Sequence, residues 1–292
     1  MASAQNELQA LISLLDDPDE LVFDQIRLKI ESMGEGIIPV LEDAWEHEAY
    51  GILFQSRVEN IIHNIQFDNV KADLKQWAST EEKDLLTGML SLAKYQYPEI
   101  DEEEIKTTIN RLEKDIWLEF HDGLTALEKL KVFNHILFDV HGFEGNKKNY
   151  HSSDNSFINR VLEGKKGNPI SLAILYLILS KRLDLPVYGV NLPRHFILAW
   201  GDQMQLPMHQ EGADSKILFY INPFSGGSVF GKSDIDAFLA ELKLKPNPIF
   251  FLPCSNYDIM VRSMNNLIHS YEQEGHGHKA EEIRELQRII KL

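Results

Sequence analysis

The sequence holds a single cysteine, Cys254, among its 292 residues. A disulfide within the chain is therefore excluded, and thiol chemistry has only one candidate. Such low cysteine usage fits a reducing compartment. We accordingly expect a cytoplasmic protein.

Basic residues are also scarce. The 29 Lys and Arg residues are outnumbered by 45 Asp and Glu residues, which gives a formal net charge of −16. A protein that binds the phosphates of a nucleic acid needs a basic surplus, so we expect no nucleic-acid partner. The acidic excess favours solubility and says little about the fold.

Long apolar segments are missing as well. The longest apolar run, residues 170–179, is far shorter than the roughly 20 residues that a membrane span needs. The first residues, MASAQNELQALISLLDD, lack the charged and apolar regions of a signal peptide. We expect neither a membrane-spanning helix nor a secretion signal.

Helical spacing of apolar residues dominates the first part of the chain. Leu8, Leu11, Ile12 and Leu15 recur at intervals of three and four residues, and Pro39 fits the first turn of a later helix. The segment LLDDPDELVFDQIRLKIESMGEGIIPVLEDAW resembles one HEAT-type helical pair. We predict a helical, partly HEAT-like domain over residues 1–115.

The pattern changes after residue 140. A polar loop precedes an apolar helix over residues 170–183, and three apolar segments, VYGVNL, HFILAW and ILFYIN, have the composition of strands. The sequence between the last two predicts a hairpin loop. The fold class is therefore α+β, with a small antiparallel sheet packed on helices.

Three polar residues stand in this apolar region. Ser171 lies just inside the start of the predicted helix, His195 begins a predicted strand, and Asn222 ends another. A nucleophile, a base and a residue that orients the base are the parts of acyl-transfer chemistry. A buried structural histidine and an Asn-Pro turn are the simpler interpretation of the last two. We expect the side chains of His195 and Asn222 to interact across adjacent strands.

A resemblance bears on this region. FNHILFDVHGFEGN, YHSSDNSFINRVLEGKKGNPISLAILYLILSKRL, GVNLPRHFIL and INPFSGG resemble the transglutaminase-like core of the bacterial SirB-type family. The resemblance implies a papain-like core over residues 116–248. The final segment is similar to the family's tetratricopeptide-like tail, which implies a helical domain over residues 249–292.

The same resemblance implies a degenerate active site. Active members of the superfamily open a helix with Gly-x-Cys, and Pro169 falls at the cysteine position in GNP. His195 and Asn222 match the family's His and Asp positions, but Asn offers no negative charge to an imidazolium. Arg194 replaces a usual glycine, and its side chain is suited to cover the histidine or bind an acidic group. We assign Pro169, Arg194 and Asn155 to the surrounding pocket.

Other candidate sites are weaker. Asn155 belongs to the segment DNS, which is also suited to cap the following helix. His276 and His278 supply fewer ligands than a metal site needs, and we expect no metal or cofactor. Cys254 follows an apolar run and is expected to be a buried, non-functional thiol.

Two classes of function follow. The first is a non-catalytic, transglutaminase-like regulatory or interaction module that binds a protein or peptide partner, as tetratricopeptide-like tails do. The alternative is a hydrolase or acyltransferase acting on amide or ester bonds through Ser171, His195 and Asn222. We favour the first class because the superfamily's nucleophile is missing.

Overall fold

The computed structural model describes residues 2–46, 51–202 and 216–291. The chain divides into two compact units, Met1–Asp73 and Leu74–Leu292. The sequence pattern placed a domain boundary near residue 115. The structure groups α5 (Leu85–Lys94) and α6 (Glu102–Leu118) with the second unit, because they pack against α8 and α9 there.

The second unit contains a four-stranded antiparallel sheet in which sequence neighbours are also spatial neighbours. Its strands are β3 (Val187–Val190), β4 (Ile197–Gly201), β5 (Ile217–Asn222) and β6 (Ser228–Phe230). The three strands expected from apolar segments are thereby confirmed, and with them the α+β class. The expected loop between β4 and β5 falls mainly on residues 203–215, outside the described residues.

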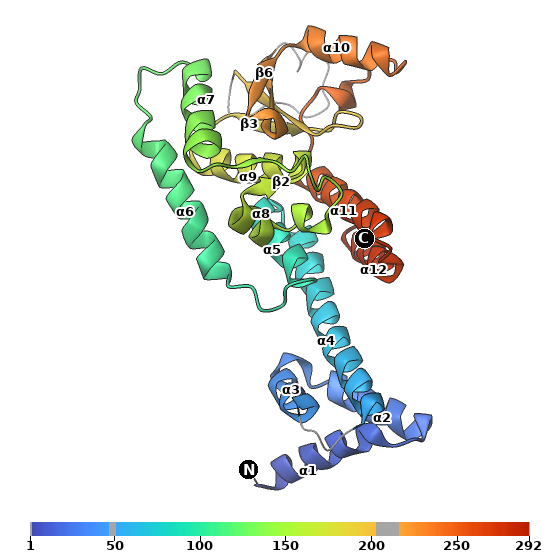
Figure 1. The fold of residues 1–292 in the computed structure, drawn as a ribbon. Helices are drawn as coiled ribbons and strands as arrows, with labels where there is room; N and C mark the ends of the chain where they lie inside the picture. Colours follow the sequence, from blue (N-terminus) through green and yellow to red (C-terminus); the bar gives the residue numbers. More distant parts are fainter. Residues whose placement is uncertain (1, 47–50, 203–215, 292) are drawn as a thin grey trace. The chain divides into compact units, whose positions relative to one another are not determined.

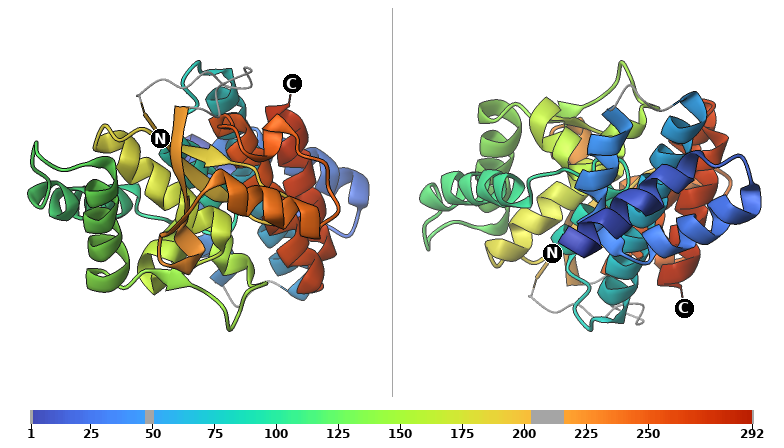
Figure 2. Two further views of the ribbon diagram at one scale, coloured as in Figure 1. Left: turned by 90° about the horizontal axis from the view of Figure 1, so that it is seen from above. Right: turned by 90° about the horizontal axis from the view of Figure 1, so that it is seen from below.

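Helices cover both faces of this sheet. Helix α10 (Lys232–Glu241) packs its Ile235 and Leu239 against Ile197 and Ala199 of β4. Helix α9 (Pro169–Arg182) packs against β3 and β4. Figure 1 shows the sheet between these two helices, and the view from above in Figure 2 shows the strands lying across the helical layer. Alternate strand residues therefore enter two different apolar layers.

The segment before α9 consists of short helices, short strands and irregular loops. Helix α7 (Ala126–Asn134) continues into a π-helical segment, His135–Val140. The strands β1 (Glu144–Gly145) and β2 (Lys166–Gly167) form a parallel pair, and α8 (Ile158–Gly164) lies between them in sequence. This pair brings the polar loop that follows residue 145 next to the start of α9.

Two helices end the chain, as expected. They are α11 (Asn256–Gln273) and α12 (Gly277–Ile290), which pack against each other. Met260, Met264 and Leu267 of α11 are fully buried. The helical nature of this tail is confirmed, and its tetratricopeptide-like character stays a prediction.

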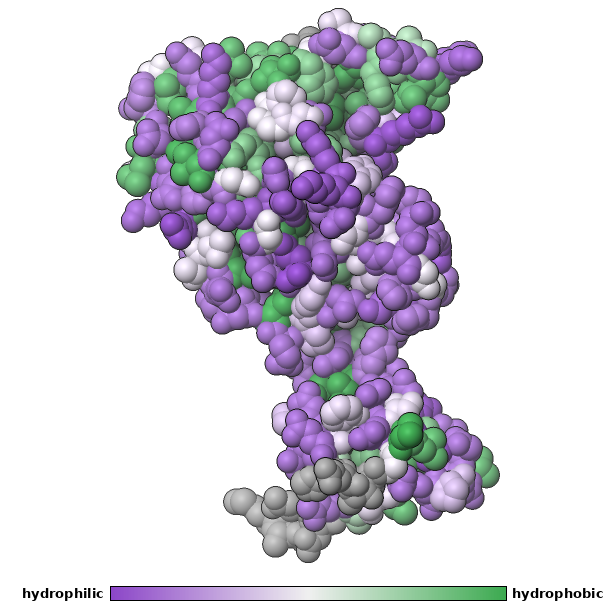
Figure 3. Space-filling model, viewed as in Figure 1, coloured by the Kyte–Doolittle hydropathy of each residue, from purple (hydrophilic) through white to green (hydrophobic). Residues whose placement is uncertain are grey.

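The face of the protein that Figure 3 draws is mostly hydrophilic, and its apolar side chains gather in separate patches. Within the described ranges, no helix is both long enough and apolar enough to cross a bilayer.

The first unit is entirely helical over its described residues. Its helices are α1 (Ala2–Ser13), α2 (Glu20–Glu31), α3 (Ile38–Glu46) and the first part of α4 (Ile52–Ser79). Its core is formed by apolar side chains from all four helices and their connections. These side chains are Leu11, Ile12, Leu15, Ile30, Ile37, Leu41, Phe54, Val58, Ile61 and Ile65.

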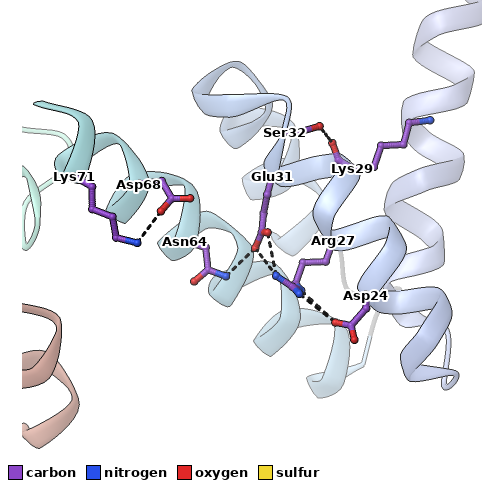
Figure 4. Close-up of polar contacts among 8 residues, drawn as sticks. All are labelled: Asp24, Arg27, Lys29, Glu31, Ser32, Asn64, Asp68 and Lys71. Atoms are coloured by element: carbon purple, nitrogen blue, oxygen red, sulfur yellow. Dashed lines mark hydrogen bonds and ion pairs between the residues drawn. The ribbon is translucent and has the colours of Figure 1, made fainter. Parts of the chain in front are cut away.

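Two arginines link segments of the first unit through hydrogen bonds and ion pairs. Arg57 is 5% exposed, and its guanidinium donates to the carbonyl oxygens of Leu15 and Asp17 at 2.8 and 2.7 Å and pairs with Glu20. Arg27 pairs with Asp24 and with Glu31, which also accepts from Asn64 (Figure 4). Both guanidiniums are thus matched to carboxylates.

Candidate functional site

The start of α9 explains most of the motif GNPIS. Asn168 is the N-cap residue and Pro169 occupies the first turn, where its missing N–H does no harm. A Cβ on Gly167 would lie 2.5 Å from Ser171 Oγ, so a larger residue there would displace the hydroxyl from its cap. The motif therefore starts the helix, and Pro169, which the resemblance matches to the cysteine of active relatives, is its first residue.

The hydroxyl of Ser171 belongs to this device. Ser171 Oγ accepts from the backbone N–H of Asn168 at 3.0 Å, and Asn168 Oδ1 accepts from the N–H of Ser171 at 2.9 Å. The hydroxyl also lies 3.3 Å from the Asn168 carbonyl, to which it donates. Ser171 is 2% exposed. The reciprocal pattern is a capping box, which satisfies two backbone donors that helix ends leave unpaired.

Asn155 organises the loop before α8. Its Nδ2 donates to the carbonyl oxygens of Asn149 and Tyr150 at 2.7 and 3.1 Å, and its Oδ1 accepts from Asn146 at 2.8 Å. The expectation that DNS caps the next helix is wrong, because Phe157 is the N-cap of α8 and makes no side-chain cap. Asn155 instead folds the loop back on itself.

The loop is joined to α9 through one further hydrogen bond. Asn168 Nδ2 donates to Ser156 Oγ at 3.1 Å, and Ser156 is fully buried. Ser156, Asn168 and Ser171 therefore form one buried, hydrogen-bonded polar group at the helix start, and Asn155, also buried, precedes Ser156 in the chain. Buried polar groups of this kind hold a structure in one arrangement when their hydrogen bonds are complete.

A tight turn presents His195. The backbone N–H of His195 donates to Leu192 O at 3.1 Å, with Pro193 and Arg194 between them. Arg194 has a φ of 64°, in the left-handed region. Pro followed by a residue of positive φ is the arrangement of a type II turn, which favours glycine at the position of Arg194. The resemblance implies glycine at this position, and a type II turn is a physical reason for it.

His195 is exposed and lies two residues before β4, slightly outside the strand that it was expected to begin. Its ring meets that of Phe238 from α10 edge-on, with 5.1 Å between the centroids. Partial burial lowers the pKa of His195, and the positive charge of Arg262 lowers it further. The neutral imidazole is therefore favoured.

Asn222 is the last residue of β5, as expected. Its Nδ2 donates to Ser225 Oγ at 3.2 Å, within the turn that follows. Among the described residues, no hydrogen bond joins Ser171, His195 and Asn222 in any pair. The expected interaction between His195 and Asn222 is not among them, and the catalytic roles of all three stay a prediction.

Cys254 lies apart from the start of α9. It is 7% exposed, and its backbone N–H donates to Gly189 O at 2.9 Å. Burial, followed by the nearby charge of Asp258, raises the pKa of its thiol to about 12. A thiol in such surroundings is inert at neutral pH, because the thiolate is the nucleophile.

Two residues near these positions were missed in the sequence. Asn168 was recognisable, because Asn and Ser three residues apart before an apolar helix have the spacing of a capping box. Arg262 of α11 was not, since its approach to His195 is a long-range contact without a local pattern. The described part of the chain holds no group of three or more His, Cys, Asp or Glu side chains arranged for a metal ion.

Comparisons with known proteins place this geometry in context. The profile described as transglutaminase-like superfamily matches residues 103–265. A UPF0162 protein of Xylella fastidiosa (strain Temecula1) is 29% identical over 222 residues, which cover 71% of each chain. A UPF0162 protein of Vibrio cholerae is 29% identical over 168 residues, 56% of this chain and 58% of the relative.

A eukaryotic protein shares part of the same region. Human F-box only protein 21 is 27% identical over 178 residues, which cover 53% of this chain and 27% of the relative. No solved structure matches this chain.

Proposed function

Because this chain belongs to the transglutaminase-like superfamily, and the resemblance matches Pro169 to the superfamily's nucleophile, we propose that it is a non-catalytic module that binds a protein partner. The main support is the state of Ser171, the hydroxyl residue two positions after Pro169. Its hydroxyl is buried and forms hydrogen bonds that cap α9.

An attacking serine needs a base in hydrogen-bond contact with its hydroxyl. Ser171 Oγ has both of its hydrogen bonds with the backbone of Asn168. His195, the expected base, packs against Phe238. To act as a nucleophile, Ser171 would have to leave the cap, and the helix start would lose the hydrogen bonds that define it.

The remaining thiol does not supply a substitute. A pKa of about 12 leaves Cys254 almost entirely protonated at neutral pH. It also lies in the connection before α11, outside the helix that carries the nucleophile in the superfamily. Cys254 is therefore not suited to replace the nucleophilic cysteine of the superfamily.

The relatives support a modular role for this core. In human F-box only protein 21 the matched region is about a quarter of the length, so the core is one part of a larger protein there. The UPF0162 protein of Xylella fastidiosa matches this chain along most of both lengths. A core that recurs in such different contexts suits an interaction module.

The test is a pair of assays on the purified protein. A fluorophosphonate probe reports an activated serine, and incorporation of a labelled amine into casein reports transglutaminase activity. We expect neither signal above that of a heat-denatured sample. Removal of a triad nucleophile lowers rates by about 10⁶, so residual activity would be far below detection.

Matched variants make the assays decisive. Labelling that is lost in both Ser171→Ala and His195→Ala, and kept in Ser79→Ala at an exposed helix position, would establish a serine hydrolase and overturn the proposal.

A further inference from the structure

One arginine of this protein differs from the others in its partners. The buried or half-buried arginines Arg27, Arg57, Arg160 and Arg284 each pair with at least one carboxylate. Arg262 of α11 is half-buried as well, but among the described residues it has one hydrogen bond, from Nη1 to Asn191 Oδ1 at 3.2 Å.

This arrangement leaves most of the guanidinium unused. The group has five N–H donors in a planar fork. Asn191 accepts at one of them, and no carboxylate forms an ion pair with Arg262 in the described part of the chain. Burial lowers the pKa of Arg262, and no carboxylate is among the nearby groups that act on it. Because Arg262 is only half-buried, its unused donors are open to a ligand from outside the chain.

The surroundings of Arg262 are aromatic and lie in the former active-site region. Its charge acts on exposed His195, whose ring contacts Phe238. Tyr150, which is 41% exposed, lies close enough to act on Arg262 and meets the ring of Phe224 edge-on, 5.8 Å between centroids. Phe224 follows Asn222 and Pro223, and the resemblance matches Asn222 to the superfamily's Asp.

We infer that Arg262, with Asn191 and His195 beside it, binds a carboxylate of an acidic peptide segment in a partner protein. The inference rests on the proposed function and names the chemistry of the partner. A guanidinium pairs with a carboxylate through two parallel hydrogen bonds, and Asn191 fixes one edge of the fork for that purpose.

A peptide fits these surroundings better than a small free anion. The side chains of Tyr150 and His195 are exposed, and both lie near enough to Arg262 to interact with its charge, so their rings are available to residues next to the carboxylate. Arginine and aromatic residues together are enriched among the residues that dominate binding at interfaces. The net charge of −16 does not prevent this contact, because charges more than about 8 Å away are screened at physiological ionic strength.

The experiment uses two peptides that differ by one carboxylate. N-acetyl-Phe-Glu-Phe-amide and N-acetyl-Phe-Gln-Phe-amide are titrated into the full-length protein, with the arginine Nε–H and His195 ring signals followed by NMR. We expect the Glu peptide to bind about tenfold more tightly, because its carboxylate accepts charge-assisted hydrogen bonds that the Gln amide does not. Equal affinity of the two peptides would refute the inference.

Variants assign the effect to Arg262. Arg262→Gln is expected to lower affinity for the Glu peptide by about tenfold or more, to the level of the Gln peptide. Arg111→Gln removes an exposed helical arginine and is expected to change affinity less than about twofold. An unchanged affinity in Arg262→Gln would overturn the inference.

Two further measurements test the geometry of the pairing and the identity of the anion. Arg262→Lys keeps the charge without the planar fork, and it takes the place of Arg262→Gln if that variant fails to fold; affinity equal to that of the unaltered chain would count against the carboxylate pairing. Inorganic phosphate is titrated in parallel. If it saturates the same signals at lower concentration than the Glu peptide, a phosphate site replaces the one inferred.

Failure of this inference is distinguishable from failure of the proposed function. A protein that binds both peptides equally and shows no fluorophosphonate labelling refutes the carboxylate site alone. A protein that prefers the Glu peptide and is labelled at Ser171 refutes the non-catalytic role alone.

Discussion

Asn168 and Ser171 each accept a hydrogen bond from the other's backbone N–H, at 2.9 and 3.0 Å, across the first turn of α9. Replacing either side chain with alanine removes half of this cap. We expect Ser171→Ala to lower the free energy of unfolding by about 1 kcal/mol. Asn168→Ala should lower it further, because it also leaves the buried hydroxyl of Ser156 without its donor.

Urea denaturation followed by circular dichroism measures both effects. Thr125→Ala is the comparison, since Thr125 forms the same kind of cap on α7 at an exposed position. A Ser171→Ala variant as stable as the unaltered chain would contradict the capping role of Ser171.

Arg194 holds a backbone conformation that favours glycine, with a φ of 64°. The left-handed region costs a non-glycine residue about 1–2 kcal/mol, and glycine returns part of that through the entropy of its unfolded chain. Arg194→Gly should therefore raise the free energy of unfolding by about 0.5–1 kcal/mol. Arg194→Ala keeps the unfavourable φ and should show no gain. Equal gains in the two variants would mean that the side chain, and not the turn, is responsible.

Local patterns predicted the elements that carry the candidate residues. The apolar run after Pro169 gave a helix close to α9, and Asn222 ends β5 as its position before proline suggested. The sequence did not predict which residues lie near His195. Arg262 acts on His195 because α11 packs into this region, and no local sequence pattern indicates such long-range packing. In the sequence, Ser171 fitted two roles, a nucleophile and a helix-capping residue. Its hydrogen bonds in the structure are those of a capping residue.

The pKa of His195 reports on Arg262. Partial burial and the charge of Arg262 lower it, so Arg262→Gln should raise it toward the ordinary histidine value of about 6.5. NMR titration of the ring signals measures the change. A pKa that stays the same in Arg262→Gln would show that burial alone is responsible.

The lowered pKa also gives stability a pH dependence. The unfolded chain binds a proton at His195 more readily than the folded chain does. The contribution of neutral His195 to the free energy of unfolding is therefore fully present above the ordinary histidine pKa. This contribution is lost as the pH falls from the ordinary pKa through the lowered pKa of the folded chain. The difference in unfolding free energy between the unaltered chain and His195→Gln should therefore decrease on acidification, and a difference that grows would contradict the assignment.

Cys254 should be unreactive in the folded protein. With a pKa of about 12, the thiolate fraction at pH 8 is ~10⁻⁴, and burial also blocks access. We expect a dithiobis(nitrobenzoate) reagent to label it slowly in buffer and rapidly in urea. Cys254→Ser should leave peptide binding unchanged. Fast labelling of the folded protein would show that the thiol is accessible and that its expected inertness is wrong.

Two buried serines offer a last test of the packing of the second unit. Ser180 in α9 and Ser263 in α11 are fully buried, and their hydroxyls have no hydrogen-bond partner among the described residues. A buried unsatisfied hydroxyl costs about 1–3 kcal/mol, and alanine also favours the helix. Ser180→Ala and Ser263→Ala should each raise the free energy of unfolding by about 1 kcal/mol.

Ser91→Ala is the matched control, because Ser91 is a buried helical serine that donates to Thr87 O at 3.1 Å and should show no gain. Destabilisation by Ser180→Ala or Ser263→Ala in urea denaturation would mean that the hydroxyl has a partner in solution, such as a bound water.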